Sequence, residues 1–128
     1  MSAFEEAMTA ELIWMARAGL PARTVRLTVH ECLLTRIGRG PLGAREVSDA
    51  VEAAVRAACR LVRELDAPDE LVEAVCRGAL EAVRGHGGAS AQWLPAAAGA
   101  THAVLEELAR ERGDEGTWRW LVQREPGW

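Results

Sequence analysis

Lysine, tyrosine and asparagine are absent from this 128-residue chain, and phenylalanine occurs once. Every basic side chain other than histidine is therefore an arginine, which we interpret as the coding bias of a GC-rich bacterial genome. The sequence also lacks any run in which Val, Ile, Thr or aromatic residues alternate with polar ones, the usual signature of a strand. These absences argue against a β-sheet and predict an all-α fold.

Motifs for metals, nucleotides and cofactors are also missing. The three cysteines, Cys32, Cys59 and Cys76, are an odd number without the paired spacing of a zinc site. No Glu precedes a histidine by three residues, as a di-iron bundle would require, and no glycine-rich phosphate loop is present. We therefore expect no metal and no cofactor, and we expect three buried thiols in a reducing compartment.

Two further features bear on location. The chain starts with Glu5 and Glu6 where a secretory signal would carry basic and then apolar residues. Residues 85–105 contain no Asp, Glu or Arg, but their glycines, Pro95 and Gln92 make them too polar for a membrane span. We expect a cytoplasmic protein without a transmembrane segment, and the sequence leaves open whether 85–105 is a loop, a helix or a partner-binding surface.

The strongest pattern in the sequence is a pair of amphipathic segments. Apolar residues recur every three or four positions across residues 44–65 and again across 67–84. The break between them contains Asp66 and Pro68, and we expect Asp66 to cap the second helix. A link this short predicts an antiparallel hairpin at the centre of the fold.

The remaining segments complete a bundle of about five helices in a single domain spanning residues 1–128. Ser2 and Glu5 have the spacing of a capping box, so a helix should follow to about residue 17. Further helices are predicted for 21–37 and for 95–113, with Pro95 in the first turn of the latter. A short last helix should begin at Thr117.

The predicted helix 21–37 has an unusually wide apolar arc, which suggests burial on more than one side or a place in a subunit interface. Arg26 and His30 lie within or at the rim of that arc and need polar partners. Together with Arg23 they form a possible polar site.

Charge is unevenly distributed along the chain. The whole chain has a net charge of −4, which argues against a general DNA-binding protein. Residues 20–45 hold five arginines and one glutamate, so this segment is +4 and the rest must be −8. This basic patch could bind an acidic partner, RNA or an anionic surface, or could pair with the chain's own Glu70, Glu73 and Glu81, which is the interpretation we favour. Its members are Arg23, Arg26, Arg36, Arg39 and Arg45.

Tryptophan is the one abundant aromatic residue, with five copies. Trp is enriched at interfaces because one edge of the ring is apolar and the other can bond to water. Trp14 lies away from the apolar stripe of the first helix, Trp120 points away from the predicted stripe of the last helix, and Trp128 is terminal. We expect these three tryptophans to be interface residues.

Arg23 and Thr24 followed by His30 resemble the motif of the HEPN family of helical-bundle RNases, an Arg and a polar neighbour followed by four to six residues and a His. The resemblance implies a dimer in which two such pairs meet and cleave RNA without a metal. The match lies early in the chain, whereas the family usually carries it late. The alternative is a structural role in which His30 pairs with Arg26 or Glu31.

We expect an all-α, homodimeric protein that acts through self-association and protein binding rather than catalysis. The first alternative is a HEPN-like RNase or toxin–antitoxin component. The second alternative is an amphipathic coat or adaptor protein on a lipid or polymer surface.

Overall fold

The computed structural model describes residues 2–38, 43–85 and 90–113. Over these residues the chain forms five helices and no strand, which confirms the predicted all-α bundle. The helices are α1 (Ala3–Arg17), α2 (Ala22–Ile37), α3 (Ala44–Leu65), α4 (Asp69–Arg84) and α5 (Ser90–Arg112).

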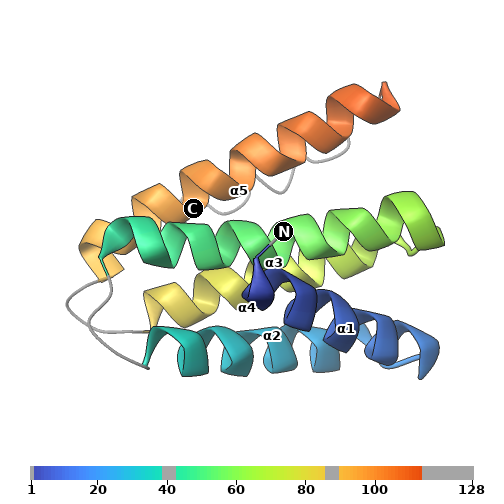
Figure 1. Cartoon of the computed structure of the whole chain (residues 1–128), viewed down its shortest axis with the longest axis horizontal. Helices are drawn as coiled ribbons and strands as arrows, with labels where there is room; N and C mark the ends of the chain where they lie inside the picture. The colour runs from blue at the N-terminus through green and yellow to red at the C-terminus, as the bar shows by residue number, and fades with distance from the viewer. Residues whose placement is uncertain (1, 39–42, 86–89, 114–128) are drawn as a thin grey trace.

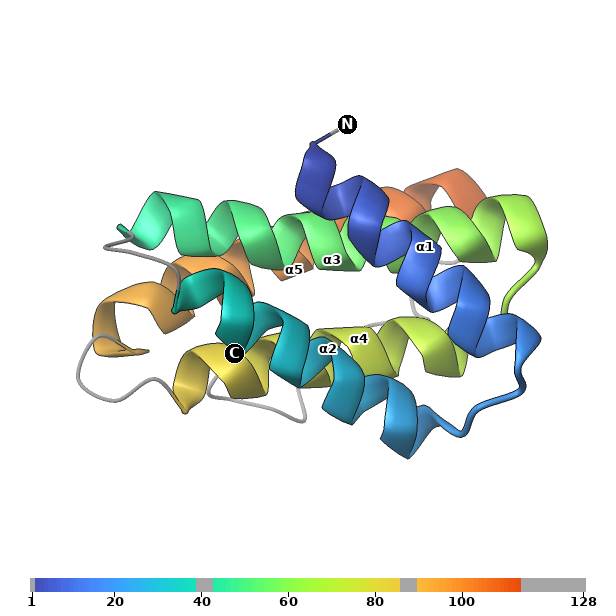
Figure 2. The same cartoon turned by 60° about the horizontal axis from the view of Figure 1, so that its bottom comes forward.

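The helices are arranged around the hairpin of α3 and α4, which occupies the middle of the molecule (Figure 1). Helix α5 lies on one side of this hairpin, and α1 and α2 lie on the other. Figure 2 shows α1 and α2 in front of α3 and α4, with α5 behind. All five helices contribute side chains to one continuous apolar core.

The hairpin confirms the predicted pair, with boundaries close to those expected. Helix α3 ends at Leu65, and Asp66 follows in the left-handed conformation with φ of 56° and ψ of 35°. An aspartate tolerates this conformation better than most side chains, because it is short and polar. Asp66 therefore ends α3 and does not cap α4, whose N-cap position is Pro68. Our expectation that Asp66 caps α4 was therefore wrong, because the N-cap position lies two residues later.

Helix α1 begins as its sequence predicts. The hydroxyl of Ser2 accepts a hydrogen bond from the backbone N–H of Glu5, at 3.1 Å. This bond satisfies one of the helix's unpaired amide groups. The inner face of α1 then buries Met8, Leu12 and Met15, largely against α3.

Helices α2 and α4 run parallel and approach very closely. The small residues Ala74, Gly78 and Ala82 are all buried and recur every four positions along α4. A Cβ atom placed on Gly78 would lie 2.4 Å from the backbone oxygen of Arg26, so no side chain fits there. The approach of the two backbones therefore requires glycine at this position.

Helices α3 and α5 also run parallel, but polar pairs connect their rims. Arg56 lies 3.4 Å from Glu107, and Arg63 lies 2.6 Å from Glu111. The hydroxyl of Ser48 donates to the carbonyl oxygen of Ala96 nearer the start of both helices. These successive contacts set the alignment of α5 along α3.

The start of α5 differs from its prediction. The helix begins at Ser90, so Pro95 lies inside it rather than in its first turn. Pro95 lacks a backbone N–H and so cannot make the helical hydrogen bond expected at its position near the start of α5. Burial of Trp93 in the core offsets the cost of that missing bond. The predicted short helix from Thr117 lies outside the described residues.

Within the part of the chain described here, none of the helices has the length and apolar character needed to cross a membrane.

Candidate functional site

Helices α1 and α2 lie next to each other over the hairpin, and they leave a groove between them. The groove has a volume of about 390 Å³ and is lined by side chains from both helices. From α1 come Phe4 and Ala7, and from α2 come Thr28, Glu31, Cys32, Thr35 and Arg36. A second hollow continues from Ala7 along α1 to Trp14. We call this surface, from Phe4 to Trp14 on α1 and from Leu27 to Arg36 on α2, the α1–α2 face.

Exposed apolar side chains are concentrated on this face. Trp14 is 61% exposed, Leu27 is 50% exposed and Leu34 is 36% exposed. The other large apolar residue described as exposed is Leu65, at 52%, which is the last residue of α3. An indole ring and two leucines on one side of a small protein mark a surface that another molecule can cover.

The polar groups of the groove offer little to a small ligand. The Thr28 hydroxyl donates to the carbonyl oxygen of Thr24 in its own helix, at 2.9 Å. Burial, with Glu11 and Glu31 nearby, raises the pKa of the Cys32 thiol, so Cys32 stays neutral. Charged groups remain at Glu31 and Arg36, on the rim.

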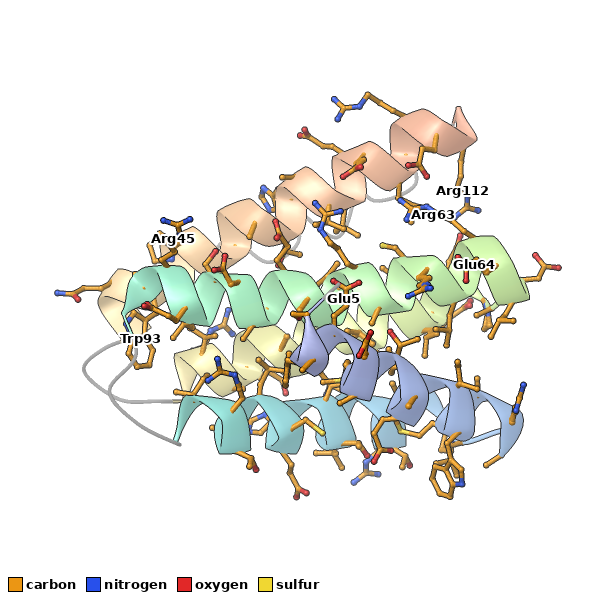
Figure 3. All side chains as sticks on the ribbon, viewed as in Figure 1. Glu5, Arg45, Arg63, Glu64, Trp93 and Arg112 are labelled. Carbon is orange, nitrogen blue, oxygen red and sulfur yellow. The ribbon has the colours of Figure 1, made fainter. Side chains whose placement is uncertain are left out.

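Charged residues on α1 and α2 mostly lack ionic partners, in contrast to those on the hairpin and α5. Across the described residues, ion pairs on the other side of the molecule involve Arg56, Arg60, Arg63, Arg77 and Arg112. No ion pair among the described residues involves Glu6, Glu11, Arg17, Arg23 or Arg36. Figure 3 shows Arg63 and Arg112 between the ends of α3 and α5, on the opposite side of α3 from α1 and α2.

The possible polar site predicted on α2 is divided by the structure. Arg26 and His30 both lie beside Glu81 of α4: Arg26 Nε is 3.5 Å from Glu81 Oε1, and His30 Nδ1 is 3.8 Å from Oε2. Arg26 Nε is within ion-pair distance but makes no hydrogen bond of good geometry. Arg23 is exposed and takes no part in this cluster. Glu81 is one of the three acids proposed above as internal partners of the basic segment.

The five arginines of the predicted basic patch do not form one cluster. Arg26 pairs with Glu81, Arg36 lines the groove, and Arg23 lies near the opposite end of α2. Arg45 is in the first turn of α3, near the start of α5 (Figure 3). Arg39 lies outside the described residues.

Of the three tryptophans predicted at an interface, Trp14 is the one that the structure describes, and it is exposed. Trp120 and Trp128 lie outside the described residues. Sequence reasoning missed the role of Trp93, a core residue of α5. The spacing of Trp93, Ala97, Val104 and Leu108 carried that signal, but Pro95 obscured it.

Other reactive side chains do not form a site. Burial raises the pKa of Cys59 to about 11 and raises that of Cys76 as well, so both thiols remain protonated in the core. The Nε2 atom of His102 is buried and without a hydrogen-bond partner. In residues 2–38, 43–85 and 90–113, no three His, Cys, Asp or Glu side chains are grouped as metal ligands would be.

Comparisons with known proteins found no match: no family model, no curated protein and no solved structure is detectably similar to this chain.

Proposed function

We propose that this protein is a non-catalytic helical bundle that acts through self-association and protein binding, and that its homodimer forms through the α1–α2 face. The observation that carries the proposal is the exposure of Trp14, Leu27 and Leu34 on one side of the hairpin. A tryptophan binds protein surfaces well because its rigid ring buries a large apolar area, and the two leucines add apolar area around it.

The arrangement of the polar residues supports binding over catalysis. His30, the residue with the clearest catalytic resemblance, lies beside Glu81 in the α2–α4 seam, away from the groove. Cys32 is kept neutral and is therefore a poor nucleophile. The three free thiols are consistent with the cytoplasm as the proposed location.

The test compares two leucines of equal exposure. Leu27→Ser removes an apolar side chain from the α1–α2 face, and Leu65→Ser makes the same change at the end of α3. Both side chains are about half exposed, so each variant should lose no more than about 0.5–1 kcal/mol of unfolding free energy. In sedimentation velocity over a range of concentrations, we expect wild type and Leu65→Ser to dimerise and Leu27→Ser to remain monomeric.

Two results would contradict this proposal. If the wild-type chain stays monomeric at all concentrations, the proposed self-association is wrong. Equal dimerisation of Leu27→Ser and wild type would move the contact away from this face.

The two alternatives predict different readouts from the same preparations. A HEPN-like RNase would cleave RNA without added metal, and the His30→Ala variant would lose cleavage while keeping its melting midpoint. A lipid-surface protein would co-sediment with anionic vesicles through Trp14. We expect neither RNA cleavage nor vesicle binding.

A further inference from the structure

We infer that the α1–α2 face binds a second copy of itself with a two-fold axis parallel to the helices, so that α1 of each copy lies on α2 of the other. The inference rests on the proposed function and specifies its geometry. It follows from how charge is divided between the two helices.

Helices α1 and α2 carry opposite net charges. Helix α1 contains three glutamates, Glu5, Glu6 and Glu11, and one arginine, Arg17, so it is −2. Helix α2 contains three arginines, Arg23, Arg26 and Arg36, and one glutamate, Glu31, so it is +2 with His30 neutral. Among the described residues, Arg26 is the member of these two sets with an ion-pair partner, Glu81.

The two helices also run in opposite directions. The N-terminal part of α1, with Phe4 and Ala7, lines the groove together with Thr35 and Arg36 near the end of α2. Figure 2 shows the two helices side by side on this surface, with their chain directions reversed. Glu11 lines the hollow that continues from Ala7, itself a residue of the groove, towards Trp14.

These facts select one of two possible dimers. A two-fold axis perpendicular to the helices would stack α1 on α1, which places −2 against −2 and +2 against +2. An axis parallel to the helices places α1 over α2 of the second copy, so the acidic half of each α1 meets the part of α2 that carries Arg36. Like charges opposed across an interface are costly, whereas opposite charges steer association and fix the register.

Apolar residues would hold the centre of this contact. The exposed Trp14 of each copy meets the outer surface of the partner copy's α2, which presents Leu27 and Leu34. The groove beside Cys32 provides space for side chains of the second copy. An aromatic anchor in a hollow with a charged rim is the usual composition of a stable interface.

The test is a charge exchange between helices. Glu11→Arg reverses the charge on α1, and Arg36→Glu reverses the charge on α2. Alone, each variant would oppose like charges twice across the two-fold axis, and we expect its dimer to weaken about tenfold or more. Mixed together, the two variants should form a heterodimer, because both contacts are again between opposite charges. The double variant, with both changes in one chain, should recover the homodimer.

Two exposed residues of α5 provide matched controls. Glu106→Arg and Arg110→Glu change the net charge by the same amounts on a surface away from the α1–α2 face. We expect the controls, alone or mixed, to dimerise as wild type does. Sedimentation equilibrium measures every dissociation constant in this set.

The outcomes separate this inference from the function on which it rests. A monomeric wild type would overturn both. A second case is a wild type that dimerises and loses its dimer in Leu27→Ser, while the charge variants form no heterodimer and the double variant does not recover. That result would overturn the proposed two-fold arrangement but would still support the α1–α2 face as the dimer interface. Single variants that dimerise as strongly as wild type would point to a perpendicular axis, because like charges already face each other in that arrangement, and would also contradict the inference.

Discussion

The two sides of the α3–α4 hairpin are covered in different ways. On one side, α5 buries Trp93 and Leu108 and pairs its charges along the rim, with Arg56 on Glu107 and Arg63 on Glu111. On the other side, α1 and α2 bury their inner faces equally well but leave outward-facing leucines, an exposed tryptophan and a groove. The α5 side therefore resembles an ordinary solvent-exposed surface, with its charges in ion pairs. The α1–α2 side, with exposed apolar side chains and a groove, has the features of a protein-binding surface.

The largest expected effect comes from a pair of glycines on opposite sides. Gly78→Ala should destabilise the protein by about 1–3 kcal/mol, because the added methyl group meets the backbone of Arg26 in the α2–α4 seam. Gly99→Ala in α5 meets nothing within 4 Å and should stabilise by about 0.5–1 kcal/mol through helix propensity. Urea melts of the two variants check this opposition of sign. Equal changes in unfolding free energy for the two variants would show that α2 and α4 leave room for a side chain at position 78.

A second prediction uses the absence of lysine and tyrosine. Between pH 9 and 11 the thiols are the side chains of this chain that titrate, because arginine stays charged. Burial raises the pKa of Cys59 from 9.0 to about 11 in the folded protein. Its stabilising contribution is therefore complete below pH 9 and is lost as the pH rises towards 11, since the unfolded chain releases the proton first.

The expected decrease is up to about 1.4 kcal/mol of unfolding free energy per pH unit for each buried thiol. Cys76, whose pKa burial also raises, should add to it. Urea melts at pH 8, 9 and 10 measure the slope. A stability that stays constant over this range would mean that both thiols are accessible to water.

The smallest expected effect concerns the charged rims. Arg63→Gln removes an ion pair with Glu111 and should cost roughly 0.2–1 kcal/mol at low salt, with the cost decreasing in 1 M salt. Arg36→Gln removes a charge that has no ion-pair partner among the described residues, so monomer stability should hardly change. A comparable loss of unfolding free energy for Arg36→Gln, measured at a concentration where the chain is monomeric, would contradict this contrast between the α5 side and the α1–α2 side.

The sequence predicted the fold well where the pattern was periodic and its ends were marked. The hairpin followed from apolar residues at three- and four-residue spacing and from the break around Pro68. The start of α5 could not be predicted in this way, because Pro95 indicates a helix start and only packing reveals that Trp93 is buried. Asp66 was misassigned because a short polar residue suits either end of a helix.

The candidate site could be predicted less completely. The wide apolar arc of α2 indicated burial on two sides, and Trp14 was selected because it lies off the inner stripe of α1. The groove itself depends on how far apart α1 and α2 settle on the hairpin, which no local pattern specifies. The separation of Arg26, which lies beside Glu81 of α4, from Arg36, which lines the groove, likewise depends on how α2 packs and is not specified by a local pattern.

The most direct measurement of the central claim uses Cys32 as a reporter within the groove. Cys32 is half-buried, whereas Cys59 and Cys76 are fully buried in the core, so Cys32 should be the first thiol that iodoacetamide labels in the native protein. If a second copy covers the α1–α2 face, the labelling rate at Cys32, read by mass spectrometry, should fall as wild type passes from monomer to dimer. The rate should stay constant over the same concentrations in Leu27→Ser. A wild-type rate that does not change while sedimentation reports a dimer would contradict the account, because the groove would then remain open in the assembled protein.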